Sequence, residues 1–358
     1  MLAGVCLASG AAPKAEVVAS GLDHPWGVAF LAEGRFLVSE RPGRLRIIES
    51  GGKVGPPIAG VPTVAAWGQG GLLDVVADSG FARNRTVYFC FSEPEAGSGA
   101  NSTALASARL SVDQSRLEDL KILFSQKPKV VSRAHFGCRI VEAKDGTLFL
   151  TLGDRFSRKD DAQRLDNHLG KIVRIEKDGT VPKDNPFVGK PGALPEIWSY
   201  GHRNGQGATL APDGRFWMTE HGPQGGDEIN IPLAGHNYGW PVITYGENYG
   251  GGKIGDGITE KEGMEQPLHY WVPSIAPSGM AFLTSDRYGA AWKGNLFVGS
   301  LKFGYLDRIE LKDGKVVAEN KLLAEGKARI RDVRQGPDGL LYVLTDESNG
   351  QLIRLLPD

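Results

Sequence analysis

The sequence predicts an all-β fold, a six-bladed β-propeller whose blades are four-stranded antiparallel sheets. The main observation is a pattern that returns six times: a small-residue turn, an apolar strand, a Gly or Asn turn and a second apolar strand. The second is composition, since 49 glycines and 21 prolines in 358 residues suit many short strands joined by turns. Hairpin repeats spaced by tens of residues are typical of propellers.

The six copies of the repeat run along almost the whole chain. They lie at 27–40, 71–91, 139–151, 208–220, 279–300 and 333–346. Further strand pairs such as 43–48 and 350–356 follow the copies, so each blade has four strands. Residues 15–358 therefore form one propeller domain. Val17 and Val18 are predicted to supply an edge strand that closes the ring against the last blade.

Two segments depart from the hairpin pattern. Residues 160–171 lack a two-residue period, which indicates a helical turn or a loop. Residues 244–270 are rich in glycine and polar side chains and are too long for a hairpin turn. Long loops of this kind are usually functional or disordered.

The N-terminal residues, the net charge and the cysteines indicate where the protein is located and which partners it can have. Residues 1–14 are predicted to be the remnant of a secretory signal or a disordered terminus, and we favour export to the periplasm or the medium. A net charge of −1 without basic runs argues against nucleic acid, and no apolar run is long enough to span a membrane. Cys90 and Cys138 lack metal-like spacing. A disulfide between them stays open, but buried free thiols are favoured.

Loops on one face of a propeller gather around its centre, so residues far apart in sequence converge there. Histidine takes up a proton near neutral pH, which makes His135, at the start of the third repeat, a candidate general base. Asp154 follows the second strand of that repeat and would orient the imidazole. Arg203 precedes the fourth repeat, and arginine recognises carboxylates through two parallel hydrogen bonds. The structural alternatives are a loop histidine, a turn aspartate and an arginine paired with Glu220 or Asp227.

Cationic and amide side chains also lie beside the repeated strands. Arg329 and Arg331 alternate around Ile330, so both can point to the centre while the isoleucine points away. Cations that converge on one channel would bind a polyanion. The alternative is that charges on an edge strand are only solvated. The candidate ligands of such an anion are Gln69, His135, Arg203, Asn204, Lys302, Arg329 and Arg331.

The glycine-rich stretch 199–241 supplies oxygen donors. Glycines permit tight turns that bring main-chain carbonyls close to a ligand. Carbonyl and carboxylate oxygens are the ligands that calcium prefers, although the spacing here is not that of an EF-hand loop. The alternative is that the two acids of this stretch only end a turn. The candidate calcium ligands are Gly222, Pro223 and Tyr238 through their carbonyls, with Asp227 and Glu228.

Together these features resemble the soluble quinoprotein aldose sugar dehydrogenases of the glucose/sorbosone dehydrogenase family. The resemblance covers nearly the whole chain. Several motifs in the same order are more specific than any one alone. They are the segments 67–74, 202–204, 220–230, 237–241 and 329–332.

The resemblance implies a six-bladed propeller that binds pyrroloquinoline quinone (PQQ) and Ca²⁺ and oxidises aldoses at the anomeric carbon to aldonolactones. By matching position, His135 is the base, Asp154 orients it, and Arg203 stabilises charge on the reduced quinone. Gln69, Asn204, Lys302, Arg329 and Arg331 resemble the other contacts of the quinone and its carboxylates. Gly222 and Pro223 resemble the ligands of the calcium at the cofactor, and Asp227, Glu228 and Tyr238 resemble a neighbouring calcium site.

The expected partners are an aldose substrate and an external electron acceptor. The large insertions of the glucose-specific members are absent, so we expect a monomer or a weak dimer. Two other functions stay open. One is a calcium-dependent propeller hydrolase such as a lactonase, and the other is a propeller that binds ligands without catalysis, because a fold alone decides neither.

Overall fold

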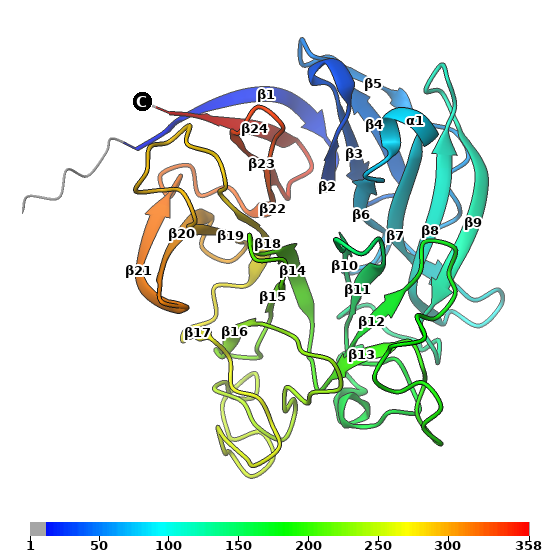
Figure 1. Ribbon diagram of the computed structural model, residues 1–358, viewed down its shortest axis with the longest axis vertical. Helices are drawn as coiled ribbons and strands as arrows, with labels where there is room; N and C mark the ends of the chain where they lie inside the picture. Colours follow the sequence, from blue (N-terminus) through cyan, green and yellow to red (C-terminus); the bar gives the residue numbers. More distant parts are fainter. Residues whose placement is uncertain (1–11, 358) are drawn as a thin grey trace, which may run out of the picture.

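Short apolar strands that end at Gly, Asn or Asp fold into six four-stranded antiparallel sheets around a common centre (Figure 1). The computed structural model describes residues 12–357. It confirms the predicted six-bladed propeller, and the six sequence repeats are the two inner strands of the six blades.

The first three blades, from the inner strand outward, follow chain order. The first has β2 (Pro25–Phe30), β3 (Phe36–Glu40), β4 (Arg44–Ile48) and β5 (Val54–Pro57). The second has β6 (Leu72–Ala77), β7 (Thr86–Pro94), β8 (Asn101–Leu110) and β9 (Leu117–Ser125). The third has β10 (Gly137–Glu142), β11 (Leu148–Leu152), β12 (Lys171–Ile175) and β13 (Ile197–Tyr200).

The remaining blades repeat this order, and the last one closes the ring. The fourth has β14 (Gly205–Leu210), β15 (Phe216–Glu220), β16 (Asp227–Asn230) and β17 (His269–Trp271). The fifth has β18 (Pro277–Phe282), β19 (Leu296–Ser300), β20 (Tyr305–Lys312) and β21 (Lys315–Leu322). The sixth has β22 (Ile330–Gln335), β23 (Leu341–Thr345), β24 (Gly350–Leu356) and, on its outer edge, β1 (Lys14–Leu22).

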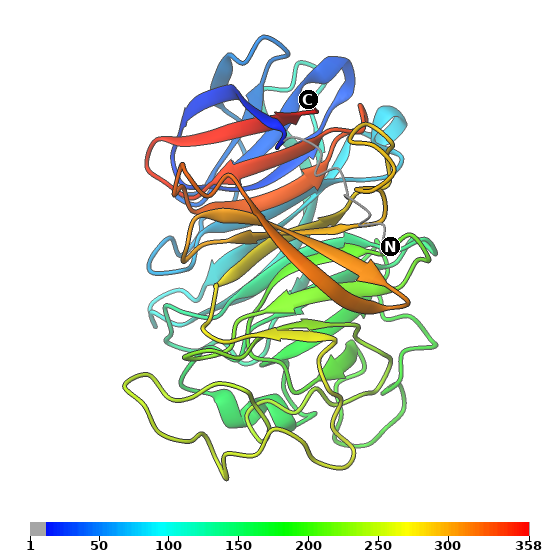
Figure 2. The ribbon, with the colours of Figure 1, turned by 90° about the vertical axis from the view of Figure 1, so that its left-hand side faces the viewer.

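The predicted closing strand and both irregular segments are confirmed. β1 contains Val17 and Val18 and pairs antiparallel with β24, so the two ends of the chain share one blade. A short 3₁₀ helix, η2 (Lys159–Gln163), lies in the segment 160–171; the other helical turns are η1 (Ala32–Gly34) and α1 (Phe81–Asn84). The loop between β16 and β17 projects from one end of the molecule in both ribbon views (Figures 1 and 2).

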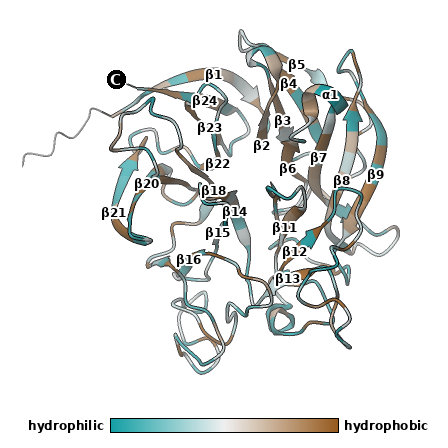
Figure 3. Cartoon of the chain, viewed as in Figure 1, coloured by the Kyte–Doolittle hydropathy of each residue, from teal (hydrophilic) through white to brown (hydrophobic). Residues whose placement is uncertain are grey.

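Hydrophobic side chains stabilise the ring mainly between neighbouring blades. Leu37 of the first blade packs in one cluster with Phe89 of the second, and five more clusters fill the other interfaces. At the seam, Val38 of the first blade packs with Leu344 and Leu352 of the sixth. The outer strand β21 alternates between exposed and half-buried residues and is mostly hydrophilic, whereas inner strands such as β6 are hydrophobic (Figure 3).

A buried ionic network fills the centre of the ring. Arg139 on β10 contacts Asp332 on β22 at 2.9 Å and Asp74 on β6 at 3.3 Å. Arg334 contacts the same two carboxylates. At Gly27 a Cβ atom would lie 2.7 Å from the Asp74 carboxylate, so glycine permits this close approach. The network ties the second, third and sixth blades together at the centre.

The expectation of free thiols at Cys90 and Cys138 is wrong, because the two residues form a disulfide. Cys90 lies on β7 and Cys138 on β10, 48 residues apart. The packing of the second blade against the third brings them together, and the separation along the chain does not reveal this.

The expectation for the N-terminus concerns mainly residues 1–11, which lie outside the described residues, and it stays a prediction. Within residues 12–357, no helix has both the length and the hydrophobicity of a membrane-spanning segment.

Candidate active site

The predicted catalytic and cofactor residues converge on one face, where the inner strands begin and the second strands end. Two adjoining hollows lie there, and Pro223 and Tyr249 line both. The histidine hollow, of about 230 Å³, is bordered by His135, Asp154 and Arg203. The cationic hollow, of about 810 Å³, is bordered by Gln69, Asn204, Lys302, Arg329 and Arg331. The cationic hollow has a size typical of small-molecule sites.

His135 and Asp154 form a buried pair. Asp154 lies just after β11, separated from the end of the strand by Gly153 alone. Its Oδ1 lies 2.6 Å from His135 Nδ1. An ionised carboxylate places the ring proton on Nδ1, which leaves Nε2 as the proton acceptor. Burial lowers the pKa of His135 below its ordinary value of about 6.5, even though the Asp154 charge acts to raise it. The imidazole is therefore neutral at neutral pH, as a general base requires.

The loop that carries His135 has an unusual backbone. His135 has φ 53° and Cys138 has φ 82°, a region that side chains other than glycine rarely adopt. The loop is held in place by hydrogen bonds from His135 N to Gln69 Oε1 and from Gly137 N to Asn204 Oδ1. Backbone strain of this kind is often found at functional sites.

Arg203 faces the same hollow. In the structural alternative given above, the Arg203 side chain pairs with Glu220 or Asp227. Only the main chain of Arg203 contacts Glu220, since Arg203 N donates to Glu220 Oε2 at 2.6 Å. The guanidinium instead donates to the carbonyls of His221 and Gly222. Its Nε is buried and has no hydrogen-bond partner within residues 12–357. Among the described residues, no carboxylate forms an ion pair with this guanidinium, so its positive charge faces the hollow.

The cationic hollow has an excess of positive charge. Arg331 and Arg329 both contact Asp346 Oδ2, and Arg331 also donates to Gln206. The buried Nε of Arg331 has no partner in the described part of the chain. Lys302 lies on the rim beside the ring of Phe303. Ile330 between the two arginines is buried in the core, as the alternation predicts.

The predicted calcium ligands divide into two groups. Gly222, Glu228 and Tyr238 line one small cavity, together with Glu220. Burial and the negative charge of Glu220 raise the pKa of Glu228 to about 8. Two buried carboxylates that repel each other are a suitable environment for a cation. Within residues 12–357, no three His, Cys, Asp or Glu side chains group as metal ligands, so carbonyls would complete the set.

The other group is less suited to a metal. Asp227 accepts hydrogen bonds from Gly222 N, Ser274 Oγ and the amides of Ile275 and Ala276, so its carboxylate organises the loop. The carbonyl of Gly222 accepts from Arg203 at 2.7 Å. Pro223 lies at the junction of the two hollows.

Several residues of the site carry roles that the sequence does not reveal. Asp346 fixes two arginines, Trp240 contacts Asp154, and Phe156 and Tyr249 form part of the rim of the histidine hollow. One available signal was that the second strands of two repeats end in Glu40 and Glu220, while Asp346 directly follows the second strand of a third. Acids at matching repeat positions lie at the same face of a propeller.

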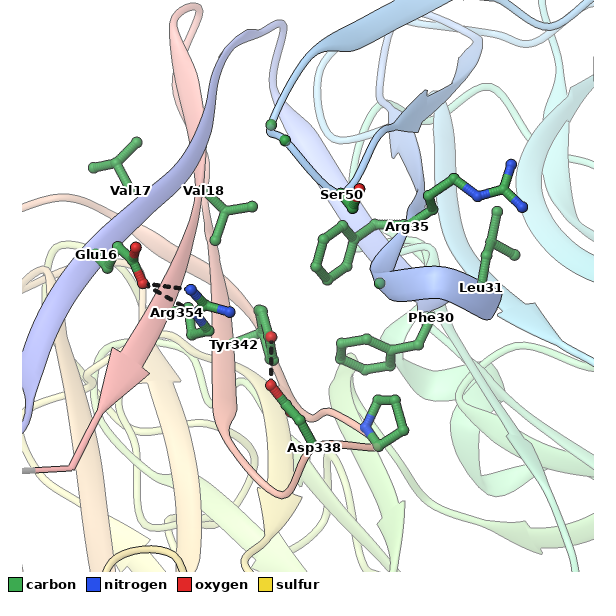
Figure 4. A pocket seen from close by; sticks show the side chains of 15 residues that line it. Glu16, Val17, Val18, Phe30, Leu31, Arg35, Ser50, Asp338, Tyr342 and Arg354 are labelled. Atoms are coloured by element: carbon green, nitrogen blue, oxygen red, sulfur yellow. Dashed lines mark hydrogen bonds and ion pairs between the residues drawn. The ribbon is translucent and has the colours of Figure 1, made fainter.

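A further hollow of about 540 Å³ lies elsewhere, at the seam between the sixth and first blades. It is near the β2–β3 turn, on the face opposite His135, and none of the predicted site residues line it. Figure 4 shows its polar groups paired with one another, Glu16 with Arg354 and Asp338 with Tyr342. We therefore place the active site at the other face.

Comparison with known proteins shows what this chain is similar to. The family model for Glucose / Sorbosone dehydrogenase matches residues 22–354. Aldose sugar dehydrogenase YliI of Escherichia coli is 45% identical over 99% of this chain and 96% of its own length. A crystal structure of a glucose dehydrogenase has a TM-score of 0.93 at 49% identity, covering 97% of this chain and all of that one. The PQQ-bound aldose sugar dehydrogenase of Streptomyces coelicolor has a TM-score of 0.77 at 27% identity, covering 96% and 100%.

The fold, the site and these matches define an oxidoreductase built on a β-propeller. The chain belongs to the glucose/sorbosone dehydrogenase family, which confirms the resemblance drawn from its motifs.

Proposed function

We propose that this protein oxidises aldose sugars at the anomeric carbon to aldonolactones, with PQQ and Ca²⁺ as cofactors. The observation that carries the proposal is the meeting of the His135–Asp154 pair with a hollow bordered by Lys302, Arg329 and Arg331. A base next to an anion site suits an enzyme that holds a polyanionic cofactor beside its substrate.

The cationic hollow is chemically suited to PQQ. PQQ carries three carboxylates, and the hollow offers four cations (Arg41, Lys302, Arg329 and Arg331) against the one carboxylate of Asp346, together with the amides of Gln69 and Asn204. The unpartnered Nε of Arg331 is a buried donor that such an anion would satisfy. Arginine and lysine bind carboxylates by charge-assisted hydrogen bonds.

From the family resemblance, the carbonyls of Gly222 and Pro223 are proposed to hold the calcium at the cofactor, although the Gly222 carbonyl also accepts from Arg203. The neighbouring cavity with Glu228 and Tyr238 is proposed as a second calcium site. The geometry favours Glu228 over Asp227 as the carboxylate ligand, because the oxygens of Asp227 already accept four hydrogen bonds. Asp227 then supports the site by fixing the loops around it.

The residues of the histidine hollow perform the proton transfer. His135 Nε2 removes the proton of the anomeric hydroxyl, and Asp154 stabilises the imidazolium that forms. Arg203 places positive charge in the histidine hollow, where it would stabilise the negative charge that develops on the reduced cofactor. Bound PQQ would supply the acceptor for the hydride of the anomeric carbon, with bound calcium as a Lewis acid beside it, and the electrons would pass on to an external acceptor.

The protein is also proposed to be exported to the periplasm or the medium, as a monomer or weak dimer. The disulfide between Cys90 and Cys138 supports export, because disulfides persist mainly in oxidising compartments. Fractionation of cells and sedimentation of the purified protein test the two statements.

Reconstitution tests the proposed activity. Purified protein is mixed with PQQ and Ca²⁺, aldoses are added, and reduction of an artificial dye is followed, with chelator and PQQ-free samples as controls. Sugar-dependent reduction that needs both cofactors is the expected result. Lactone hydrolysis without dye reduction would instead support the hydrolase, and ligand binding without either reaction would support the binding module.

A further inference from the structure

We infer that Trp240 is a positioning residue that fixes the His135–Asp154 pair in its working orientation, an inference that rests on the proposed function. Trp240 lies in the segment 237–241, which the sequence marks as a motif without indicating a role. The residue lines the histidine hollow together with His135, Asp154 and Arg203.

The two oxygens of Asp154 have different partners. Oδ1 contacts His135 Nδ1 at 2.6 Å and accepts from Phe156 N at 2.8 Å. Oδ2 accepts from Trp240 Nε1 at 2.8 Å, and within residues 12–357 this indole is its one hydrogen-bond donor. Without the Trp240 N–H, Oδ2 of Asp154 would therefore lose its hydrogen bond.

Holding both oxygens fixes the plane of the carboxylate. A carboxylate held at one oxygen can still rotate about its Cβ–Cγ bond, whereas donors on both oxygens prevent this rotation. The plane of Asp154 sets the direction of its bond to Nδ1, and this sets where Nε2 of the imidazole points. Small errors in the placement of a base are known to reduce rates strongly.

Trp240 is itself rigidly placed. Its amide donates to Gly201 O at 2.9 Å, and its carbonyl accepts from Gln163 Nε2 at 2.8 Å. The indole is 8% exposed and packs with Ala162 and Ile254 in a small apolar cluster of its own. A side chain anchored in this way can hold a neighbour in one orientation.

The ring of Trp240 also contacts the second charged group of the site. The guanidinium carbon of Arg203 lies 5.2 Å from the centre of a Trp240 ring, which is a cation–π distance. One indole thus contacts Asp154 by its N–H and Arg203 by its face. Trp240 sets the base and the cation in a fixed relation to each other.

Two variants separate these contacts. Trp240→Phe keeps an aromatic face for Arg203 but removes the N–H, and Trp240→Leu removes both. Trp198→Phe is the matched control, because Trp198 Nε1 donates at 3.1 Å to a main-chain carbonyl, Pro232 O, away from the two hollows. The control loses the same atoms and the same kind of donor.

The first measurement needs no cofactor. Proton NMR of the protein without PQQ should show a low-field resonance for the His135 Nδ1 proton, because its bond to Asp154 is short and buried. The chain has 7 histidines, so the resonance is assigned by its loss in His135→Gln. In Trp240→Phe it should move upfield and exchange faster with water, while in Trp198→Phe it should stay unchanged.

The second measurement is the kinetics of the reconstituted enzyme. Trp240→Phe should lower kcat by about 10- to 100-fold, which is the usual effect of losing a partner that orients a functional side chain. KM should change by a smaller factor than kcat. Trp240→Leu should have a larger effect on kcat than Trp240→Phe, because it also removes the aromatic face that contacts Arg203. The acid limb of the pH profile should shift in Trp240→Phe and not in Trp198→Phe.

Two results would overturn the inference. One is an unchanged resonance with kcat within about twofold of the parent. The other is a lower kcat with an unchanged resonance and pH profile, which would make the indole a packing residue only. If the parent enzyme oxidises no aldose, the proposed function fails, whereas the NMR comparison still decides whether Trp240 holds the pair.

Discussion

The guanidinium of Arg139 lies 2.9 Å from the carboxylate of Asp332 and joins the third and sixth blades at the centre of the ring. Arg139, Asp332 and the neighbouring Asp74 are each at most 1% exposed. Charges buried this deeply are tolerated because each faces an opposite charge, and removal of one leaves the others uncompensated.

Arg139→Ala is therefore expected to lower the free energy of unfolding by about 3–5 kcal/mol. Denaturant titration of the parent and the variant measures this difference. The control is Arg109→Ala, since Arg109 forms surface ion pairs with Glu118 and Asp119 that contribute about 0–1 kcal/mol. Equal losses for both variants would contradict a special role for the centre.

The disulfide should contribute to stability as a link between two blades. The variant with Cys90→Ser and Cys138→Ser is expected to lose roughly 2–4 kcal/mol, because its unfolded chain is free of the cross-link. Thiol titration of the denatured parent should gain two groups on reduction. A parent that gains none would show that the bond does not form in the protein.

The pH profile should report His135. Burial lowers the pKa of His135, and the charge of Asp154 acts in the opposite direction. Asp154→Asn removes the opposing charge, so the pKa falls further and the acid limb of kcat/KM moves to lower pH. We also expect kcat to fall by about 10²- to 10⁴-fold, the usual contribution of a placed base.

Glu265→Gln is the control for this profile, because Glu265 forms a comparable pair with the exposed His236 at 2.7 Å. That variant should keep the profile of the parent. An acid limb that stays in place in Asp154→Asn would exclude His135 as the titrating base.

Cofactor affinity should depend on the cations of the larger hollow. Lys302→Met and Arg329→Met each remove a charge-assisted contact of about 1.5–3 kcal/mol, so the Kd for PQQ should rise at least tenfold. Titration of PQQ in the presence of Ca²⁺ measures this. Lys321→Met on the outer strand β21 is the control, and losses of the same size there would mean that only the total charge matters.

The stability of the protein should decline with pH because of Asp307. Burial, together with the neighbouring Glu319 carboxylate, raises the pKa of Asp307 to about 8. The folded protein keeps this proton, while the unfolded chain releases it near pH 4. The stabilisation is therefore complete below about pH 4 and is lost as pH rises to about 8, by at most about 1.4 kcal/mol per pH unit.

Asp307→Asn keeps a neutral side chain and should flatten this decline in urea titrations between pH 5 and 8. Asp313→Asn, in the exposed turn between β20 and β21, should keep the slope of the parent. A slope that persists in Asp307→Asn would assign it to another group.

The repeats made the fold predictable, because hairpin copies at this spacing, each of which must bury both faces against neighbouring copies, are typical of a β-propeller. The same repeats place Arg329 and Arg331 on one side and Ile330 on the other, and the structure agrees. Trp240 could not be assigned in this way, since its partner Asp154 lies 86 residues away in another blade.

The amino-acid sequence by itself determined that the chain contains six hairpin repeats and which residue types lie at the ends of their strands. Periodicity and turn residues act over a few positions, so a sequence displays them directly. Only the closed ring decided that Cys90 meets Cys138, that Asp346 holds two arginines and that the oxygens of Asp227 are already used. Such contacts depend on how neighbouring blades pack, and the separation of two residues along the chain does not show whether that packing brings them together.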